Sequence, residues 1–289
     1  MNNEDYPAIY QATDSASIIA QKYFICLNFG YLLSVILATL SSFLNSFNSF
    51  FGVFSVIFFL IGLFTLIIIL TKKYENKWYE CRAAAESIKT ATWRFMMRAE
   101  PYEDVPNLIE VKSRFRNLIR AILSQNNAIA DYLGGEDSEK DQISSKMLNI
   151  RNQSLDERKT FYVQDRIDEQ RKWYSHKYVY NKRQNTIWLS LVIFFNFIAV
   201  ILSIIKISNP QQNPPIDIFA VIAVSSLTWI QLKKFQDLSS SYALTAHEIG
   251  TIKMLFDEVK TEKELSTFVI DSENAFSREH TQWVAKRTS

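Results

Sequence analysis

Charged side chains are missing from one long stretch near the start of this chain. Between Lys22 and Lys72 the sequence has no Asp, Glu, Lys, Arg or His over 49 residues. A soluble core helix rarely stays uncharged for this long, and a cleaved signal peptide has a shorter apolar segment with no second span after it. The stretch therefore predicts two membrane-spanning helices, at about 23–44 and 51–70, joined by the turn-forming segment NSFNSF.

Glycine, proline and cysteine are scarce too. The 289 residues include six Gly and six Pro, which disfavours turn-rich β architectures and favours long helices. The two cysteines, Cys26 and Cys81, are too few for a disulfide framework and do not form a paired-cysteine metal site. The 32 basic and 30 acidic residues give a net charge of only +2, so nucleic acid is not expected as a partner.

Motifs of catalytic chemistry are also lacking. The sequence has no P-loop, GxGxxG or GxSxG motif, and its three histidines, His176, His247 and His280, are isolated. His247 does not begin an HExxH zinc motif because Thr251 stands where the second histidine would be. We therefore expect no enzyme activity, no metal site and no cofactor.

A second pair of apolar segments lies in the later half of the chain. Residues 187–205 and 216–232 are each long enough to span a membrane, the latter at the short end of the range. Three prolines between them prevent that connection from being helical throughout. The predicted fold is an all-α membrane protein with two tandem transmembrane helical hairpins and long cytoplasmic helix extensions.

Basic residues flank the spans on one side. The two hairpin tips carry almost no charge, with only Lys206 and Asp217 near the second tip. Under the positive-inside rule, the N-terminus, the middle segment and the C-terminus are all expected in the cytoplasm. The flanking residues on that side are Lys22, Lys72, Lys73, Lys77, Lys182, Arg183, Lys233 and Lys234.

The charged segments have helical spacing and few breakers. No Gly or Pro occurs from Thr71 to Glu100, so the second span is expected to continue as a helix that ends before Pro101. The fourth span is likewise expected to continue, over 233–260. Further helices are expected at about 107–133, at 154–183 leading into the third span, and at 263–286. The predicted domains are 1–133 and 154–289, with 134–153, which begins with GGEDSEKD, as the linker.

The two halves align without a gap when the sequence is shifted by 161 residues. The shift superposes the spans and their basic flanks, and it predicts two copies of one unit with the same topology. The paired residues are Lys22 with Arg183, Lys72 with Lys233, Lys73 with Lys234, Tyr74 with Phe235, Ala85 with Ala246, Ile88 with Ile249, and Thr90 with Thr251.

Three segments carry a resemblance to a known family. They are WYECRAAAESIKTATWRFMMRAEPY (78–102), RIDEQRKWYSHKYVYNKRQNTIW (166–188) and FSREHTQWVAKR (276–287), and they resemble the SLATT superfamily of SMODS- and SLOG-associating two-transmembrane effectors. The resemblance covers about residues 5–287, with one subtype in each half, as in tandem two-copy members listed under a DUF number. It implies a bacterial inner-membrane effector of nucleotide-linked conflict or anti-phage systems. Such effectors are thought to oligomerise and form a pore or otherwise breach the membrane.

Two sets of residues are candidates for a role in the membrane. One is a stripe of small residues in the first span, which lines a pore or an oligomer contact, or packs helices closely within one subunit, the alternative we favour. The other is polar residues of the second pair, which face water or bond their own helix backbone. No charged residue lies mid-span, so strong ion selectivity is not expected. The candidates are Gly30, Ser34, Ala38 and Ser42, and Asn196, Ser225, Thr228 and Gln231.

A further set is a candidate for receiving a signal in the cytoplasm. Its arginines could bind an anionic effector through their planar guanidinium groups, although exposed ion pairs on helix faces are the favoured alternative. Trp173 is expected to pack between the cytoplasmic helices. The set consists of Arg82, Glu86, Arg94, Arg98, Arg166 and Trp173.

The sequence is consistent with two functions. The leading hypothesis is a homo-oligomer whose cytoplasmic helices receive a signal, from a nucleotide or a sensor protein, and whose spans then open a leak. The alternative is a non-conducting membrane-anchored scaffold or sensor that docks a cytoplasmic partner. A small-solute carrier is less supported, because the spans lack charged midplane residues and interruptions.

Overall fold

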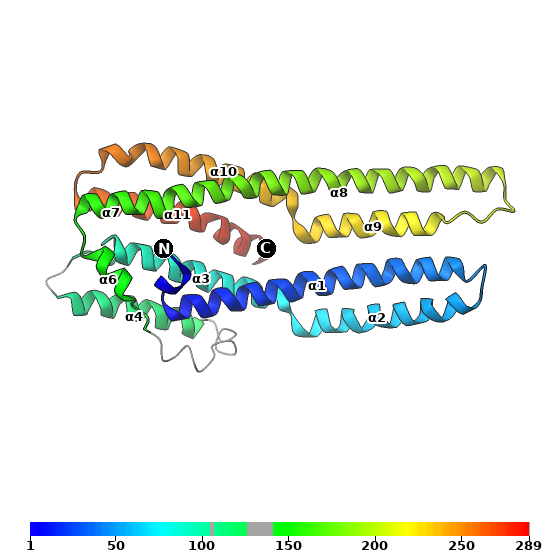
Figure 1. The fold of residues 1–289 in the computed structure, drawn as a ribbon, viewed down its shortest axis with the longest axis horizontal. Helices are drawn as coiled ribbons and strands as arrows, with labels where there is room; N and C mark the ends of the chain where they lie inside the picture. Colours follow the sequence, from blue (N-terminus) through cyan, green and yellow to red (C-terminus); the bar gives the residue numbers. More distant parts are fainter. Residues whose placement is uncertain (105–106, 126–140, 289) are drawn as a thin grey trace. The chain divides into compact units, whose positions relative to one another are not determined.

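The computed structural model describes residues 1–104, 107–125 and 141–288. All regular elements in these ranges are helices, and four are long and apolar enough to cross a membrane (Figure 1). The chain is therefore an all-α membrane protein, as predicted. The apolar segments lie in α1 (Ala8–Leu44), α2 (Phe50–Lys72), α8 (Glu169–Ser208) and α9 (Ile216–Lys233).

The chain forms two compact units, each built from both halves of the sequence. The membrane unit contains Lys22–Tyr74 and Tyr178–Ser240. The polar unit contains Met1–Gln21, Glu75–Lys177 and Ser241–Ser289. Helices α1 and α8 each contribute residues to both units.

Two helical hairpins make up the membrane unit. Helix α1 lies beside α2, and α8 lies beside α9 (Figure 1). Large apolar side chains cover their outer surfaces, as for Phe64 and Ile193, which are each 63% exposed. Such a surface is unfavourable in water and suits a lipid environment.

The expected unbroken helices after the second and fourth spans are interrupted at two lysines. Lys73 separates α2 from α3 (Tyr74–Met96), and Lys234 separates α9 from α10 (Phe235–Lys253). Both adopt left-handed backbone angles, with φ of 46° and 48°. The prediction of continuity was wrong here because it considered only Gly and Pro as breakers, whereas a left-handed C-cap residue also ends a helix.

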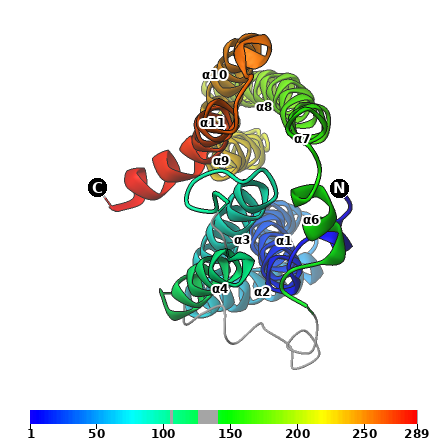
Figure 2. The ribbon, with the colours of Figure 1, turned by 90° about the vertical axis from the view of Figure 1, so that its left-hand side faces the viewer.

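The polar unit is a bundle of shorter helices (Figure 2). The expected helix at 107–133 appears as α4 up to Gln125, and residues 126–133 and most of the GGEDSEKD connector lie outside the described residues. A π-helical turn, η3, joins α7 to α8, so the predicted lead-in to the third span is helical throughout. Besides α3 and α10, the elements are η1 (Asn3–Asp5), α4 (Leu108–Gln125), α6 (Ser145–Arg151), α7 (Leu155–Tyr162), η3 (Val163–Asp168), η4 (Met254–Glu258) and α11 (Glu262–Thr288).

Helix α3 contributes eight buried apolar residues to the polar unit's core. Small residues such as Ala84 allow close approach, and Ala84 packs with Cys81 of α3 and Ala16 of α1. Trp93 is fully buried, and its Nε1 donates a hydrogen bond to the Tyr6 hydroxyl at 3.1 Å. Each large apolar side chain buried in this way contributes about 1.5–3 kcal/mol to folding.

Candidate functional site

The small-residue stripe of the first span divides between packing and exposure. Ser34 and Ala38 are buried against α2, where Ser55 Oγ donates a hydrogen bond to the Ala38 carbonyl at 3.1 Å. A Cβ atom added at Gly62 of α2 would lie 2.8 Å from Ser34 Oγ, so glycine permits the close approach of the two helices there. The middle of the stripe therefore packs one hairpin together.

The ends of the same stripe have no such contact. A Cβ added at Gly30 would meet no atom within 4 Å, and Ser42 is exposed. Neighbouring Ser41 is buried instead. Ser42 was predicted because a spacing of four residues was taken to keep side chains on one face of the helix. An α-helix has 3.6 residues per turn, so side chains spaced in this way rotate gradually away from that face over several turns.

The polar residues of the second hairpin also divide into two groups. Ser225 of α9 is buried, whereas Asn196 of α8 and Thr228 and Gln231 of α9 are exposed on the membrane unit. Asn196 Nδ2 donates to the Val192 carbonyl at 2.8 Å, and Thr228 Oγ1 donates to the Val224 carbonyl at 2.9 Å. Each of these hydrogen bonds to the helix's own backbone satisfies one donor of the side chain, but the remaining polar atoms still lie on the exposed surface of the membrane unit.

In the polar unit, the predicted signal-binding residues lie in separate sets of contacts. Arg82 forms an i,i+4 pair with Glu86 at 2.5 Å, and Arg94 donates to Asn274 Oδ1 at 2.8 Å. The Trp173 ring packs edge-on against Tyr242 of α10, with centroids 5.5 Å apart, in accordance with the expected helix packing. The two remaining residues, Arg98 and Arg166, belong to two larger networks of polar contacts.

The first network is a buried ion pair between Arg166 of η3 and Glu273 of α11. Both side chains are almost fully buried, and two guanidinium nitrogens bind the two carboxylate oxygens, Nε–Oε1 at 2.9 Å and Nη2–Oε2 at 2.7 Å. Tyr162 donates its hydroxyl to Oε1 at 3.0 Å, and Thr90 donates to Oε2 at 2.9 Å. Glu273 is thereby held by helices from both halves of the sequence.

Electrostatics keep the Arg166 guanidinium charged in spite of its burial. Desolvation opposes the charge on Arg166, but the Glu273 carboxylate outweighs it and holds the pKa of Arg166 above its usual range. Burial and the same carboxylate raise the pKa of Tyr162 well above its ordinary value, so its hydroxyl stays protonated and can donate. Removal of either ion would leave the other uncompensated in the core.

The second network surrounds the C-terminal end of α3. Arg151 of α6 donates to the Phe95 carbonyl at 2.5 Å, and Arg158 of α7 donates to the Met97 carbonyl at 2.8 Å. The end of a helix leaves its last carbonyls unpaired and carries partial negative charge, so two buried guanidinium groups are stabilising there.

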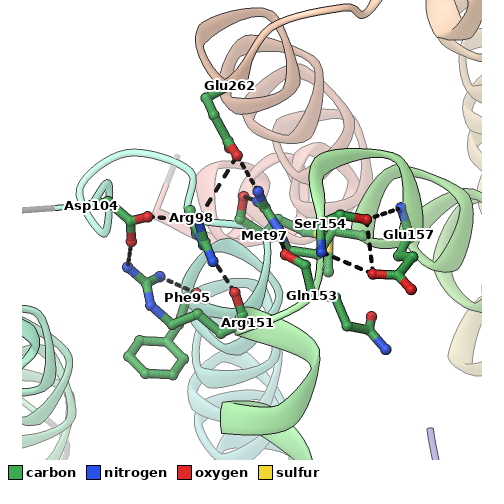
Figure 3. A network of polar contacts seen from close by, with 10 residues as sticks. Phe95, Met97, Arg98, Asp104, Arg151, Gln153, Ser154, Glu157 and Glu262 are labelled. Carbon is green, nitrogen blue, oxygen red and sulfur yellow. Dashed lines mark hydrogen bonds and ion pairs between the residues drawn. The ribbon is translucent and has the colours of Figure 1, made fainter.

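Two carboxylates, those of Asp104 and Glu262, complete the second network. Figure 3 shows Asp104 between Arg98 and Arg151, which its oxygens bind at 2.6 and 2.8 Å. Glu262 of α11 binds Arg158. Three cations thus face two carboxylates and the negative end of α3, so the charges nearly balance without an external anion. This balance favours a structural role for Arg98 over an open anion site.

Sequence reasoning missed the central members of both networks. Glu273, Arg151 and Arg158 belong to ordinary amphipathic helical segments, with no motif that marks them for burial. The capping box at Ser154, whose side chain exchanges hydrogen bonds with Glu157, is a local signal that could have located the start of α7.

Contacts within the polar unit join the two halves of the sequence. The Glu100 amide of the first half donates to Ser266 Oγ of the second half at 3.0 Å, and Lys159 donates to the Val259 carbonyl at 2.8 Å within the second half. Among the described residues, no group of three or more His, Cys, Asp or Glu side chains is arranged to hold a metal ion. The site is thus a set of charged contacts that binds the two halves into one bundle.

Comparison with known proteins divides the chain into two matched regions. Residues 7–159 match the family model of SMODS and SLOG-associating 2TM effector domain 3, and residues 162–283 match that of SMODS and SLOG-associating 2TM effector domain 1. No curated protein and no solved structure matches the chain. The matches meet near the start of η3, so both networks join one matched region to the other. The chain belongs to the SLATT family of two-transmembrane effectors, with two different SLATT domains in tandem.

Proposed function

We propose that this protein is an oligomeric effector of the bacterial inner membrane that permeabilises the bilayer in a conflict or anti-phage system. In this proposal its termini lie in the cytoplasm, where a nucleotide signal or a sensor protein acts on the polar unit. It has no enzymatic step. The observation that carries the proposal is the tandem of effector-family domains, each of which supplies one apolar helical hairpin.

The polar unit supports a shared response of both domains. Arg166, Glu273 and Thr90 lock α3, η3 and α11 to one another, although these elements come from different domains. A signal that favours one arrangement of this bundle would act on both domains at once. Helices α1 and α8 begin among polar-unit residues and continue into the membrane unit without a break, so a change at their first turns can reach the spans.

The test is membrane permeability in bacteria that express the full chain, alone and with its native neighbouring genes. A potential-sensitive dye reports small ion leaks, and an impermeant nucleic-acid dye reports larger openings. We expect depolarisation that requires intact hairpins. Gly62→Leu, which clashes with Ser34, should abolish it, whereas Gly30→Leu, which points into open space, should not.

The non-conducting scaffold makes the opposite prediction. If neither dye responds when the neighbouring genes are present and induced, and a stoichiometric partner is recovered with the chain, the effector proposal is refuted. Replacement of all four spans by unrelated spans would then leave the biological response unchanged.

A further inference from the structure

The membrane-spanning part of α8 is the least covered of the four apolar segments. In its most apolar 18-residue window none of the residues is buried, against 11–17% in the other three helices. Helix α9 packs along one side of α8, where Phe195 stacks on Phe219 with ring centroids 6.2 Å apart, but no residue of this window is buried by that contact. This leaves a long helix surface available for contact outside the chain.

One face of α8 has the spacing of a coiled-coil seam. Its residues alternate at intervals of four and three, which keeps them on one side of a helix that wraps around a neighbour. Membrane helices commonly pack in this left-handed geometry. We call this face the α8 seam, and none of its six residues is buried in the core. Ile193 and Ile207 of the seam are 63% and 79% exposed. The α8 seam consists of Leu189, Ile193, Asn196, Val200, Ser203 and Ile207.

Asn196 lies at the centre of this seam and of the span. It follows Arg183 by 13 residues and precedes Lys206 by 10, so it is close to the bilayer midplane. Its bond to the Val192 carbonyl uses one amide N–H. The described residues provide no partner for the Oδ1 acceptor, and a polar group in this position is costly when it faces hydrocarbon.

We propose that the α8 seam binds the α8 seam of a second copy of this chain, with the Asn196 side chains of the two copies hydrogen-bonded to each other. An amide is both donor and acceptor, so asparagine complements itself when two identical faces meet. The β-branched residues Ile193 and Val200, one turn to either side, pack against their counterparts and exclude lipid from the pair. The inference rests on the proposed function for the expectation that the chain assembles with itself.

The neighbours of Asn196 also argue against a water-filled lining along this face. A continuous water path needs successive polar groups, whereas the seam residues on both sides of Asn196 are aliphatic. A single polar contact inside an apolar seam instead fixes the register of two helices, as a buried asparagine does in coiled coils.

The first experiment is disulfide cross-linking of the full chain in native membranes. In a background of Cys26→Ser and Cys81→Ala, single cysteines are introduced by Ile193→Cys or Val200→Cys, which leave Asn196 intact. A disulfide needs Cα atoms about 4.4–6.8 Å apart, so the seam positions should give several times more covalent dimer than the controls. Phe194→Cys and Ile201→Cys are matched controls, exposed on the same helix but more than a quarter turn from the seam.

The second experiment measures association of labelled copies by energy transfer in dilute proteoliposomes. Asn196→Leu should weaken association roughly 3- to 30-fold, the range expected for one interhelical hydrogen bond in a membrane, and Asn196→Gln should retain it. Equal cross-linking at Phe194 and Ile193, or unchanged association of Asn196→Leu, would overturn the inference. Seam cross-links without any leak would refute the proposed function alone, and a leak without seam cross-links would refute this inference alone.

Discussion

Lys73 and Lys234 occupy equivalent positions in the two halves of the chain and adopt the same unusual backbone conformation. They are 161 residues apart, and their φ angles are 46° and 48°. Each ends a membrane helix, α2 or α9, and the next helix begins at the following residue. The 161-residue repeat therefore extends from sequence to a shared left-handed break, which an accidental alignment would not produce.

Substitution of these two lysines should reveal the strain at the breaks. A left-handed residue with a side chain is about 1–2 kcal/mol less favourable than glycine, so Lys73→Gly and Lys234→Gly should each stabilise the folded protein by roughly 1 kcal/mol. Lys73→Val should destabilise it, because a β-branched side chain fits this region poorly. The measurement is the thermal unfolding midpoint of the purified protein, followed by circular dichroism.

The adjacent residues provide the control for these variants. Lys72 and Lys233 are the last residues of α2 and α9, so Lys72→Gly and Lys233→Gly place glycine in a helix and should not stabilise. A higher midpoint for all four variants would mean that loss of positive charge, and not backbone strain, determines the effect.

The buried ion pair should be far more sensitive than the surface pairs. Glu273→Ala leaves Arg166 buried without a counter-ion and should destabilise the protein by about 3–5 kcal/mol. Arg82→Ala removes partly exposed ion pairs with Glu86 and Asp14 and should change stability by less than about 1 kcal/mol. Denaturant unfolding monitored by tryptophan fluorescence can compare them, because Trp93 lies in the same core as Arg166.

A double variant separates charge from packing in this pair. Arg166→Met combined with Glu273→Leu removes both ions and keeps apolar volume, so it should recover much of the stability lost in Glu273→Ala. A double variant as unstable as Glu273→Ala would show that the hydrogen bonds from Tyr162 and Thr90 to the carboxylate matter more than charge balance.

Alkaline pH should weaken the polar unit through Cys81. Burial raises the pKa of this thiol from 9.0 to about 11, so the folded state keeps the proton that the unfolded chain loses. The thiol's contribution to stability is therefore complete below pH 9 and is lost as the pH rises to 11. Tyr102, whose pKa burial raises to about 12, adds to the loss above pH 10.

The variant Cys81→Ala isolates the thiol's share of this effect. At pH 8 under reducing conditions it should be less stable than the wild type by about 1 kcal/mol, because a small buried group is lost. Because alanine does not titrate, the difference should shrink as the pH rises from 9 to 11. A difference that stays constant over this range would contradict the prediction.

Sequence alone could predict the membrane spans but not the charged core. The span boundaries follow from uncharged segments flanked by lysine, a signal that is local in the chain. Burial of Glu273 depends on Arg166, 107 residues earlier, and on Thr90, 183 residues earlier. No local pattern encodes such distances, so Arg166 was foreseen only as one of several exposed candidates. Similarly, Ser34 and Ala38 were identified by their spacing, but their contact with α2 required Gly62, which the stripe did not include.

The two glycines of the first hairpin provide the last prediction. Gly62 is buried, and a Cβ there would lie 2.8 Å from Ser34 Oγ, whereas Gly30 has open space around it. Gly62→Leu should separate α1 from α2, break the bond from Ser55 to the Ala38 carbonyl and lower the unfolding midpoint, because overpacking typically costs about 1–3 kcal/mol. Gly30→Leu should leave the midpoint unchanged or raise it slightly, since leucine favours helix. Thermal unfolding in detergent, with membrane insertion checked by protease protection, measures both. Equal destabilisation by the two variants would mean that Gly30 also lies in a helix contact, and the contact would then be between copies.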